Sequence, residues 1–318
     1  MTAFILTRSL VFFDSPLVSP ARSRRDRAIL VGVAAGVLLF TSAARATAQT
    51  DYYNTDRGRP VQIEDAYATE RYAFELKLAP VRAEFAQGGA STWGVEPEIA
   101  YGLLPRTHLE VGVPVLFADA GAGSRRSGVA GLELSLMHNL NVETRSLPAL
   151  GLRADVLAPV GTLAPEQTYV SVTGMITRTF PAMRVHLNGQ YTIGAAPLPL
   201  VLSPSSVATR QPVFTPRADD AAIGTAEVSR WLTGIAVDKT FPLRSMLLIA
   251  DVVARQPVVA SEDVEVTAGA GIRLQVSPSV ALDFGGGHAL NGDDREWHVT
   301  FGLAYAFALR GLMPGAGR

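Results

Sequence analysis

Apolar side chains recur at every second position over most of this chain, from residue 70 to residue 307. In residues 70–78, Tyr72, Phe74 and Leu76 fall on one face, and charged residues fall mainly on the other. A β-strand separates such residues cleanly, whereas an α-helix would scatter them around its axis. The pattern predicts about twelve strands of about 10 residues, a length that crosses a bilayer when the strand is tilted. The predicted strands cover residues 70–78, 93–103, 107–117, 129–138, 149–157, 169–178, 183–193, 227–238, 245–254, 265–276, 279–287 and 297–307.

The connectors between these strands alternate in length. Those after every second strand are short, as in residues 104–106 and 277–278, and those between are mostly longer, as in residues 118–128 and 196–225. This alternation, with an even number of strands, is typical of outer-membrane barrels, whose short turns face the periplasm and whose long loops face the outside. The sequence therefore predicts an all-β fold, namely a transmembrane antiparallel up-and-down β-barrel of about twelve strands with an N-terminal signal peptide.

The alternation alone does not say which face of the barrel is outside, because a soluble barrel has the same period. Two features favour lipid on the apolar side. The apolar face is nearly without charge, and mean hydropathy is +0.21 although no apolar run after residue 48 has the length of a membrane helix. Aromatic residues gather near strand ends, as the interfacial girdles of membrane barrels require. The girdle candidates are Trp93, Tyr101, Phe117, Tyr191, Trp231, Trp297, Tyr305 and Phe307.

The opposite face of the strands is polar and is predicted to line a lumen. Its charged residues are of both signs, in keeping with a net charge of -1 for the whole chain. Two interpretations stay open, a narrow or gated channel and a barrel plugged by interior ion pairs, because about twelve strands leave less room than the 16 or more of a general porin. The lumen-lining candidates are Arg71, Glu75, Lys77, Glu96, Glu98, Glu110, Glu133, Arg153, Asp155, Arg184, His186, Asp251, Glu265, Arg273 and Asp283.

An apolar stretch, residues 28–40, follows basic residues near the start of the chain and precedes small residues. A helix needs about 20 residues to span a bilayer, so this stretch is short for a membrane anchor, which is the alternative interpretation. It is typical of a Sec-type signal peptide, with cleavage near Ala46 or Ala48. The predicted divisions of the chain are a signal peptide (1–48), a periplasmic N-terminal segment (49–69), the transmembrane β-barrel (70–307) and a C-terminal tail (308–318).

The predicted location is the outer membrane of a Gram-negative bacterium, reached after cleavage of the signal peptide. The expected partners are outer-membrane lipid, a small-molecule solute, and the barrel-assembly machinery during biogenesis. A net charge near zero argues against nucleic-acid binding. The chain has no Cys, which excludes a disulfide framework and any Cys-based zinc site.

No H-E-x-x-H, P-loop or G-x-S-x-G motif is present. We therefore predict no catalytic residue, no metal site and no cofactor, and we do not expect an enzyme. His186 and His298 are predicted to face the lumen, where a lining role is favoured over a catalytic one. The three glycines at 285–287 are predicted to allow barrel bending or a tight interior contact, and Pro97 and Pro114 are predicted to mark bulges.

Several short motifs carry a resemblance to a known family. Residues 56–60 (DRGRP), 64–66 (EDA) and 70–76 (ERYAFEL) resemble the start of outer-membrane proteins grouped as the meta-pathway of phenol degradation family. Residues 93–98 (WGVEPE) are similar to the family's second strand, and residues 302–307 (GLAYAF) are similar to its closing strand. The resemblance covers most of the mature chain and implies an outer-membrane channel, with hydrophobic or aromatic compounds among its solutes.

The predicted function is that of a channel or transporter for passive uptake or efflux of small solutes, hydrophobic or aromatic ones among them, through a narrow polar lumen. One alternative is a barrel hydrolase acting on lipids, because some outer-membrane barrels carry Ser and His near the rim. The other is a plugged structural or adhesive barrel that acts through the long loop at 196–225. One departure from the usual barrel pattern is the tail at 308–318, since the closing aromatic Phe307 is not the last residue.

Overall fold

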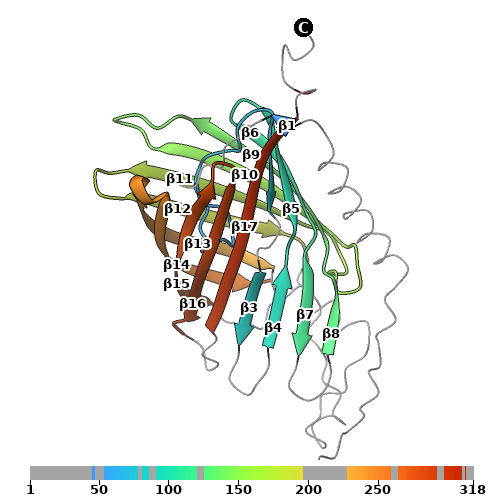
Figure 1. Ribbon diagram of the computed structural model, residues 1–318. Helices are drawn as coiled ribbons and strands as arrows, with labels where there is room; N and C mark the ends of the chain where they lie inside the picture. The colour runs from blue at the N-terminus through green and yellow to red at the C-terminus, as the bar shows by residue number, and fades with distance from the viewer. Residues whose placement is uncertain are drawn as a thin grey trace, which may run out of the picture.

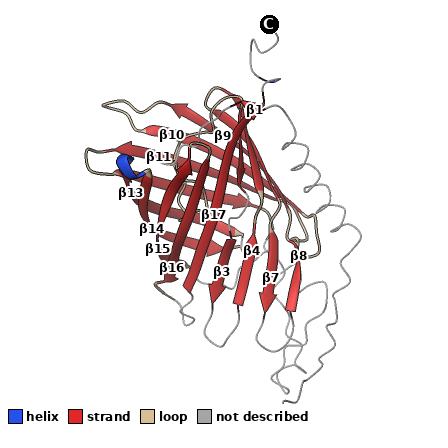
Figure 2. Cartoon of the chain, viewed as in Figure 1, coloured by secondary structure: helices blue, strands red, loops and turns tan. Residues whose placement is uncertain are grey.

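A computed structural model describes much of the chain, and the regular structure in that part is antiparallel β-sheet closed on itself (Figures 1 and 2). The described residues are 45–46, 54–77, 81–85, 91–119, 125–195, 228–258, 264–291, 297–309 and 312. The predicted loop at 196–225 and most of the predicted signal peptide and C-terminal tail lie outside them. In the described part of the chain, no helix has the length and apolarity needed to cross a membrane.

The strands follow one another round the barrel in chain order, and β17 closes it by pairing with β2 and β3. Four wall strands are each interrupted once, as β2 with β3, β4 with β5, β6 with β7, and β8 with β9. With these counted once each and β1 set aside, the 17 strands form a 12-stranded closed barrel, which confirms the predicted fold. The strands are β1 (Arg45–Ala46), β2 (Ala73–Lys77), β3 (Val81–Phe85), β4 (Ser91–Val95), β5 (Glu98–Leu104), β6 (Thr107–Gly112), β7 (Val115–Asp119), β8 (Arg125–Val129), β9 (Leu132–Asn141), β10 (Ala149–Ala158), β11 (Tyr169–Thr179), β12 (Arg184–Ile193), β13 (Ser229–Phe241), β14 (Met246–Pro257), β15 (Glu265–Ser277), β16 (Val280–Ala289) and β17 (Trp297–Leu309).

The interruptions lie where the sequence carries Pro or Gly. Pro97 separates β4 from β5, Pro114 separates β6 from β7, and Gly131, with φ of 155°, separates β8 from β9. Proline has no N–H to donate to a ladder, so the regular pairing stops at these points. The wall nevertheless stays joined, because the N–H of Val113 donates to the Pro97 carbonyl at 3.1 Å and that of Ala130 to the Pro114 carbonyl at 2.8 Å. The two prolines predicted to mark bulges therefore interrupt the strands instead.

The two ends of the barrel differ as predicted. Short turns join β5 to β6, β9 to β10, β11 to β12, β13 to β14 and β15 to β16, and one of them contains the 3-10 helix η1 (Pro242–Arg244). We call this the short-turn end and the opposite one the long-loop end. β1 belongs to the predicted signal peptide and pairs with the last residues of β17 at the short-turn end.

The apolar face of the wall is the outer face. On β9 and β10, Leu134 and Leu152 are 45% and 46% exposed, whereas the alternate residue Arg153 is 2% exposed. A soluble barrel would bury these leucines, so the exposed band is a surface for lipid. The chain is therefore a transmembrane β-barrel by fold and by surface chemistry.

The aromatic girdle candidates lie in two bands. Those at the long-loop end are Trp93, Phe117, Tyr191, Trp231 and Trp297, and those toward the short-turn end are Tyr101, Tyr305 and Phe307. Within the first band, the rings of Trp93 and Phe117 stack with centroids 3.8 Å apart. Within the second, Phe307 stacks on Phe74 at 5.3 Å and is almost fully buried by its neighbours.

Residues 54–69 lie inside the barrel, and we call them the plug segment. The Thr55 N–H donates to the Asp65 carboxylate at 3.0 Å, and the Asp65 N–H donates to the Thr55 carbonyl, so the segment doubles back on itself. It returns to the wall at the short-turn end, where the Thr69 N–H donates to His108. Residues 49–69 were predicted to form a periplasmic segment. Residues 54–69 lie in the barrel instead, where they contact inward-facing residues of the wall.

Apolar contacts seat the plug segment against one side of the wall. Val61 and Ile63 pack on Ala236, Ile249 and Val253, and Ile63 is fully buried. Further toward the short-turn end, a second buried cluster joins the plug segment to β9, β10 and β11. Its members are Ala66, Met137, Ala149 and Met175. Two buried apolar clusters are therefore contacts between the plug segment and the wall, and a further one, formed by Leu116, Ala130 and Leu163, contains no plug residue.

Candidate functional site in the barrel lumen

Charged groups of the plug segment form ion pairs with charged groups of the wall, in three clusters. The first cluster joins Asp56 to Arg273 at 2.7 Å and to Lys77 at 3.5 Å. Arg59 of the same segment pairs with Asp283 at 3.5 Å, and Asp283 in turn pairs with Arg273 at 2.5 Å. These wall residues come from β2, β15 and β16, which meet near the seam where the barrel closes.

The second cluster is centred on Arg153 of β10. Its guanidinium reaches Glu64 of the plug segment at 3.1 Å, Glu110 of β6 at 2.7 Å and Asp155 at 2.6 Å. The turn at residues 56–60 is the tip of the plug segment. Within it, Arg57 pairs with Glu133 and lies 3.3 Å from Asp155. One cation of the wall and one of the plug segment therefore share the same group of carboxylates.

The third cluster lies nearer the short-turn end and contains His186. Its Nε2 is 2.8 Å from the Asp238 carboxylate and its Nδ1 is 3.0 Å from the Thr177 hydroxyl. The Ala66 N–H of the plug segment donates to that same hydroxyl at 3.0 Å. Arg184 adds an ion pair to Asp238 at 2.6 Å. A hydroxyl, an imidazole and a carboxylate in this order resemble a hydrolytic triad, but the hydroxyl is fully buried beneath the plug segment and is engaged by its backbone.

Most of the predicted lumen-lining residues lie in this interior network. Asp251 accepts a hydrogen bond from the Gln62 N–H at 2.8 Å, and Glu265 pairs with Arg255 at 2.7 Å. Glu75 lies within electrostatic reach of the first cluster, and Glu96 lines the cavity described below. The members that make interior ion pairs are Lys77, Glu98, Glu110, Glu133, Arg153, Asp155, Arg184, Arg273 and Asp283, and His186 is hydrogen-bonded to Asp238.

Arg71 is the exception among them. Its side chain is exposed, and its guanidinium carbon lies 4.5 Å from the centroid of the Tyr72 ring. The strand predicted from residue 70 begins at Ala73, and Tyr72 before it has a φ of 67°. The chain thus turns just before it joins the wall, and the alternation predicted for Arg71 does not apply there.

The sequence did not predict the plug residues that take part in the three clusters. The missed groups are Asp56, Arg57, Arg59, Glu64 and Asp65 of the plug segment, together with Asp238 of β13. Asp238 lies on the polar face of its strand and could have been included by the same alternation. The plug residues have no periodic pattern, and their wall partners are far away in sequence.

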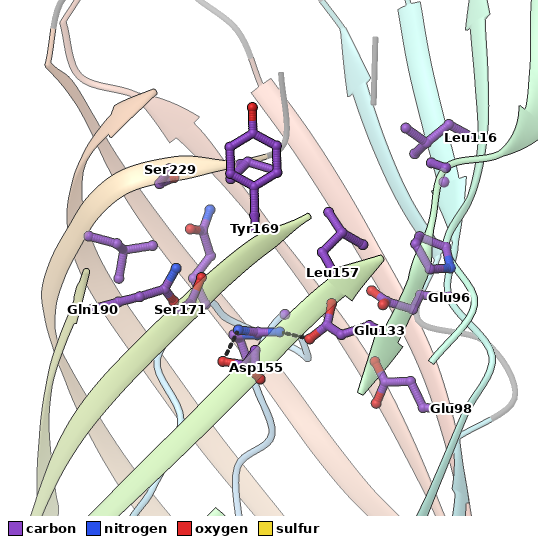
Figure 3. A pocket seen from close by; sticks show the side chains of 18 of the residues that line it. Glu96, Glu98, Leu116, Glu133, Asp155, Leu157, Tyr169, Ser171, Gln190 and Ser229 are labelled. Carbon is purple, nitrogen blue, oxygen red and sulfur yellow. Dashed lines mark hydrogen bonds and ion pairs between the residues drawn. The ribbon is translucent and has the colours of Figure 1, made fainter. Parts of the chain in front are cut away.

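A cavity of about 290 Å³ lies on the long-loop side of the plug tip (Figure 3). Arg57 and Gln62 of the plug segment line it. One wall carries four carboxylates, those of Glu96, Glu98, Glu133 and Asp155. The remaining lining is mixed, with leucines and the side chains of Tyr169, Ser171, Gln190 and Ser229. Over the described part of the chain, no group of three or more His, Asp and Glu side chains is arranged to hold a metal ion.

The closed ladder, the apolar exterior and the charged interior define the chain as a transmembrane β-barrel. Among solved structures it is similar to the KdgM porin, with a TM-score of 0.42 and 10% identity, over 73% of this chain and 98% of that one. It is also similar to an outer-membrane channel from Pseudomonas putida F1, with a TM-score of 0.47 and 14% identity, over 76% and 98%. Outer membrane phospholipase A from Escherichia coli is similar over 75% and 97%, with a TM-score of 0.36 and 10% identity. No protein-family model matches the sequence, and no curated protein matches it.

The glycines of β16 give the plug segment room, and replacing one of them is expected to displace its tip. A Cβ at Gly285 would lie 2.2 Å from the Pro60 carbonyl oxygen, which accepts a hydrogen bond from Thr300 at 2.8 Å. We expect Gly285→Val to destabilise the seated plug by about 1–3 kcal/mol, as overpacking does. Trypsin cleavage after Arg57 should then become faster. The matched control is Gly174→Val, where a Cβ meets nothing within 4 Å. Equal rates of cleavage in the two variants would contradict the close contact between Gly285 and the plug segment.

Proposed function

We propose that this protein is a passive channel in the outer membrane of a Gram-negative bacterium, and that the plug segment is its gate. Its solutes are small, with hydrophobic or aromatic compounds among them. The observation that supports the proposal most directly is that the plug segment fills the lumen without joining the sheet. Its bridge between Asp56 and Arg59 is internal, and it holds the wall through side chains and single backbone hydrogen bonds.

This arrangement lets the plug segment move while the barrel stays closed. Each wall strand keeps its ladder on both sides through neighbouring strands, so displacement of the plug segment breaks no strand pairing. The contacts that would break are ion pairs and hydrogen bonds to polar groups. Water entering the lumen can replace these, so the net cost of opening is smaller than the number of contacts suggests. The resemblance to the meta-pathway of phenol degradation family points to the same class of protein.

The test is conductance of the purified chain in planar lipid bilayers. We expect the wild-type protein to open rarely, and Asp56→Asn to open more often, because the variant weakens the pairs with Arg273 and Lys77. A charged hydrogen bond contributes about 1.5–3 kcal/mol, so open probability should rise at least about tenfold. Glu70→Gln removes an exposed carboxylate before the first wall strand and serves as the control. If neither the wild-type protein nor Asp56→Asn conducts, the barrel is a plugged structural one and the channel proposal fails.

A further inference from the structure

The cavity above the plug tip has one wall on which negative charge is not fully compensated. Glu96 and Glu98 flank Gly112 there, with Glu96 Oε1 3.0 Å and Glu98 Cγ 3.3 Å from a Cβ built on that glycine. Glu98 is paired with Lys77 at 3.0 Å. Glu96 makes no ion pair or side-chain hydrogen bond within the described ranges, and its carboxylate points toward the cavity (Figure 3). A carboxylate beside others of the same sign creates a potential that favours a cation.

An organic cation from the chain itself already lines this cavity. The guanidinium of Arg57 pairs with Glu133 and with Asp155, and all three side chains line the cavity (Figure 3). The Arg57 side chain is 31% exposed, so the pair can be reached from the cavity. This contact is independent of the uncompensated charge at Glu96. It shows that the acidic wall has the geometry to hold a planar, delocalised cation.

The rest of the lining suits an apolar body attached to that cation. Leu116, Leu157 and Leu232 line the cavity together with the ring of Tyr169. At about 290 Å³ the cavity is at the lower limit of the ~300–1,000 Å³ typical of small-molecule sites. The ligand that fits is therefore small, with one charged end and one apolar or aromatic end.

We propose that the cavity is a binding site for a small organic cation with an apolar or aromatic body, in which the amidinium or ammonium group pairs with Glu96. The same cation competes with Arg57 for Glu133 and Asp155, so binding loosens the tip of the plug segment. The inference rests on the proposed channel function, for which it names a solute class and a trigger for opening.

The experiment measures binding to the full chain in detergent micelles by isothermal titration calorimetry. Benzamidine is the cationic probe, and benzamide is its neutral analogue of nearly the same shape. We expect benzamidine to bind at least about tenfold more tightly, the factor that one charged hydrogen bond supplies. Equal binding of the two probes to the wild-type protein would overturn the proposal without the need for any variant.

Two variants separate the site from a general attraction of cations to the protein. Glu96→Gln should weaken benzamidine binding about tenfold, while Glu70→Gln, which also removes one carboxylate, should leave it unchanged. Arg57→Met should tighten benzamidine binding, because it removes the competing cation and leaves Glu133 and Asp155 available. Unchanged binding in Glu96→Gln, or weakened binding in Arg57→Met, contradicts the proposal.

Binding and conduction fail separately. Selective binding of benzamidine by a protein that never conducts would support the site and contradict the channel. Conduction by Asp56→Asn together with equal binding of benzamidine and benzamide would support the channel and contradict the site. Adding benzamidine to the bilayer chamber tests whether binding promotes opening. We expect it to raise the open probability of the wild-type protein and not that of Arg57→Met.

Discussion

A disulfide between positions 66 and 151 is expected to lock the proposed channel shut. The chain has no Cys of its own, so Ala66→Cys with Gly151→Cys introduces the only pair of thiols. A Cβ built on Gly151 lies 3.3 Å from the Ala66 Cβ, close to the ~3.5–4.5 Å that a disulfide spans. Met175 Cε lies 3.0 Å from the same position, and a flexible thioether can give way by that amount. The bond would tie the plug segment to β10.

In planar bilayers, we expect the oxidised double variant to lose nearly all openings and dithiothreitol to restore them. The plug segment is a gate only if it moves, and a covalent bond to the wall prevents that movement. Each single variant, Ala66→Cys or Gly151→Cys, controls for the effect of the substitution and should respond to neither oxidant nor reductant. Mass spectrometry establishes that the bond has formed. Equal conductance of the oxidised and reduced double variant would show that solutes pass without displacement of the plug segment.

The wall of the barrel could be predicted from the sequence because its signal is local. Alternation of period two is repeated within each strand, and inward residues such as Arg153, Asp155 and His186 follow from their neighbours two positions away. The even number of strands and the alternation of short and long connectors predict that the sheet closes into a barrel. No long-range information is needed for any of these steps, which is why the fold was predicted. The strand boundaries differ at Pro97, at Pro114 and at the start of the first strand, and β3 and most of β8 lie in stretches that were predicted as connectors.

The plug segment could not be predicted in the same way, because it has no repeating pattern and its partners are distant. Arg57 and Asp155 are separated by 98 positions, and Thr300 and Pro60 by 240. Two indirect signals did exist. Acidic residues outnumber basic ones in the predicted lumen set, so cations from elsewhere were needed to balance them. Arg57 and Arg59, which precede the first predicted strand, were among the cations not assigned to that set.

The second signal lies in β14, where the face predicted to be polar is mostly apolar. Leu247, Ile249 and Val253 point inward and are buried. In a water-filled lumen these side chains would remain wet, at a cost of about 25 cal/mol per Å² of apolar area. Ile249 and Val253 are covered instead by the plug segment, through Val61 and Ile63. A strand apolar on both faces within an otherwise alternating barrel thus indicates an interior element packed against it.

Removal of the cation at the centre of the second cluster is expected to have the largest effect on stability. Arg153 is 2% exposed and neutralises Glu64, Glu110 and Asp155, which are themselves buried. Arg153→Met keeps the apolar stem and leaves these carboxylates without their shared partner. Removal of one partner from a buried ion pair costs about 3–5 kcal/mol, because the remaining charge is uncompensated. The loss should therefore destabilise the wall and the plug segment together.

Guanidinium unfolding in detergent, followed by tryptophan fluorescence, measures this effect. We expect the unfolding midpoint of Arg153→Met to fall far below that of the wild-type protein. Arg244→Met, made at an exposed position of η1, is the matched control and should change stability by about 0–1 kcal/mol. Arg153→Lys keeps the charge, but its compact ammonium lacks the planar fork with which the guanidinium reaches carboxylates on different elements, so its midpoint should lie between those of the other two variants. If Arg153→Met unfolds at the same midpoint as Arg244→Met, the buried carboxylates are stabilised by water rather than by Arg153, and the lumen around the plug segment is hydrated even when closed.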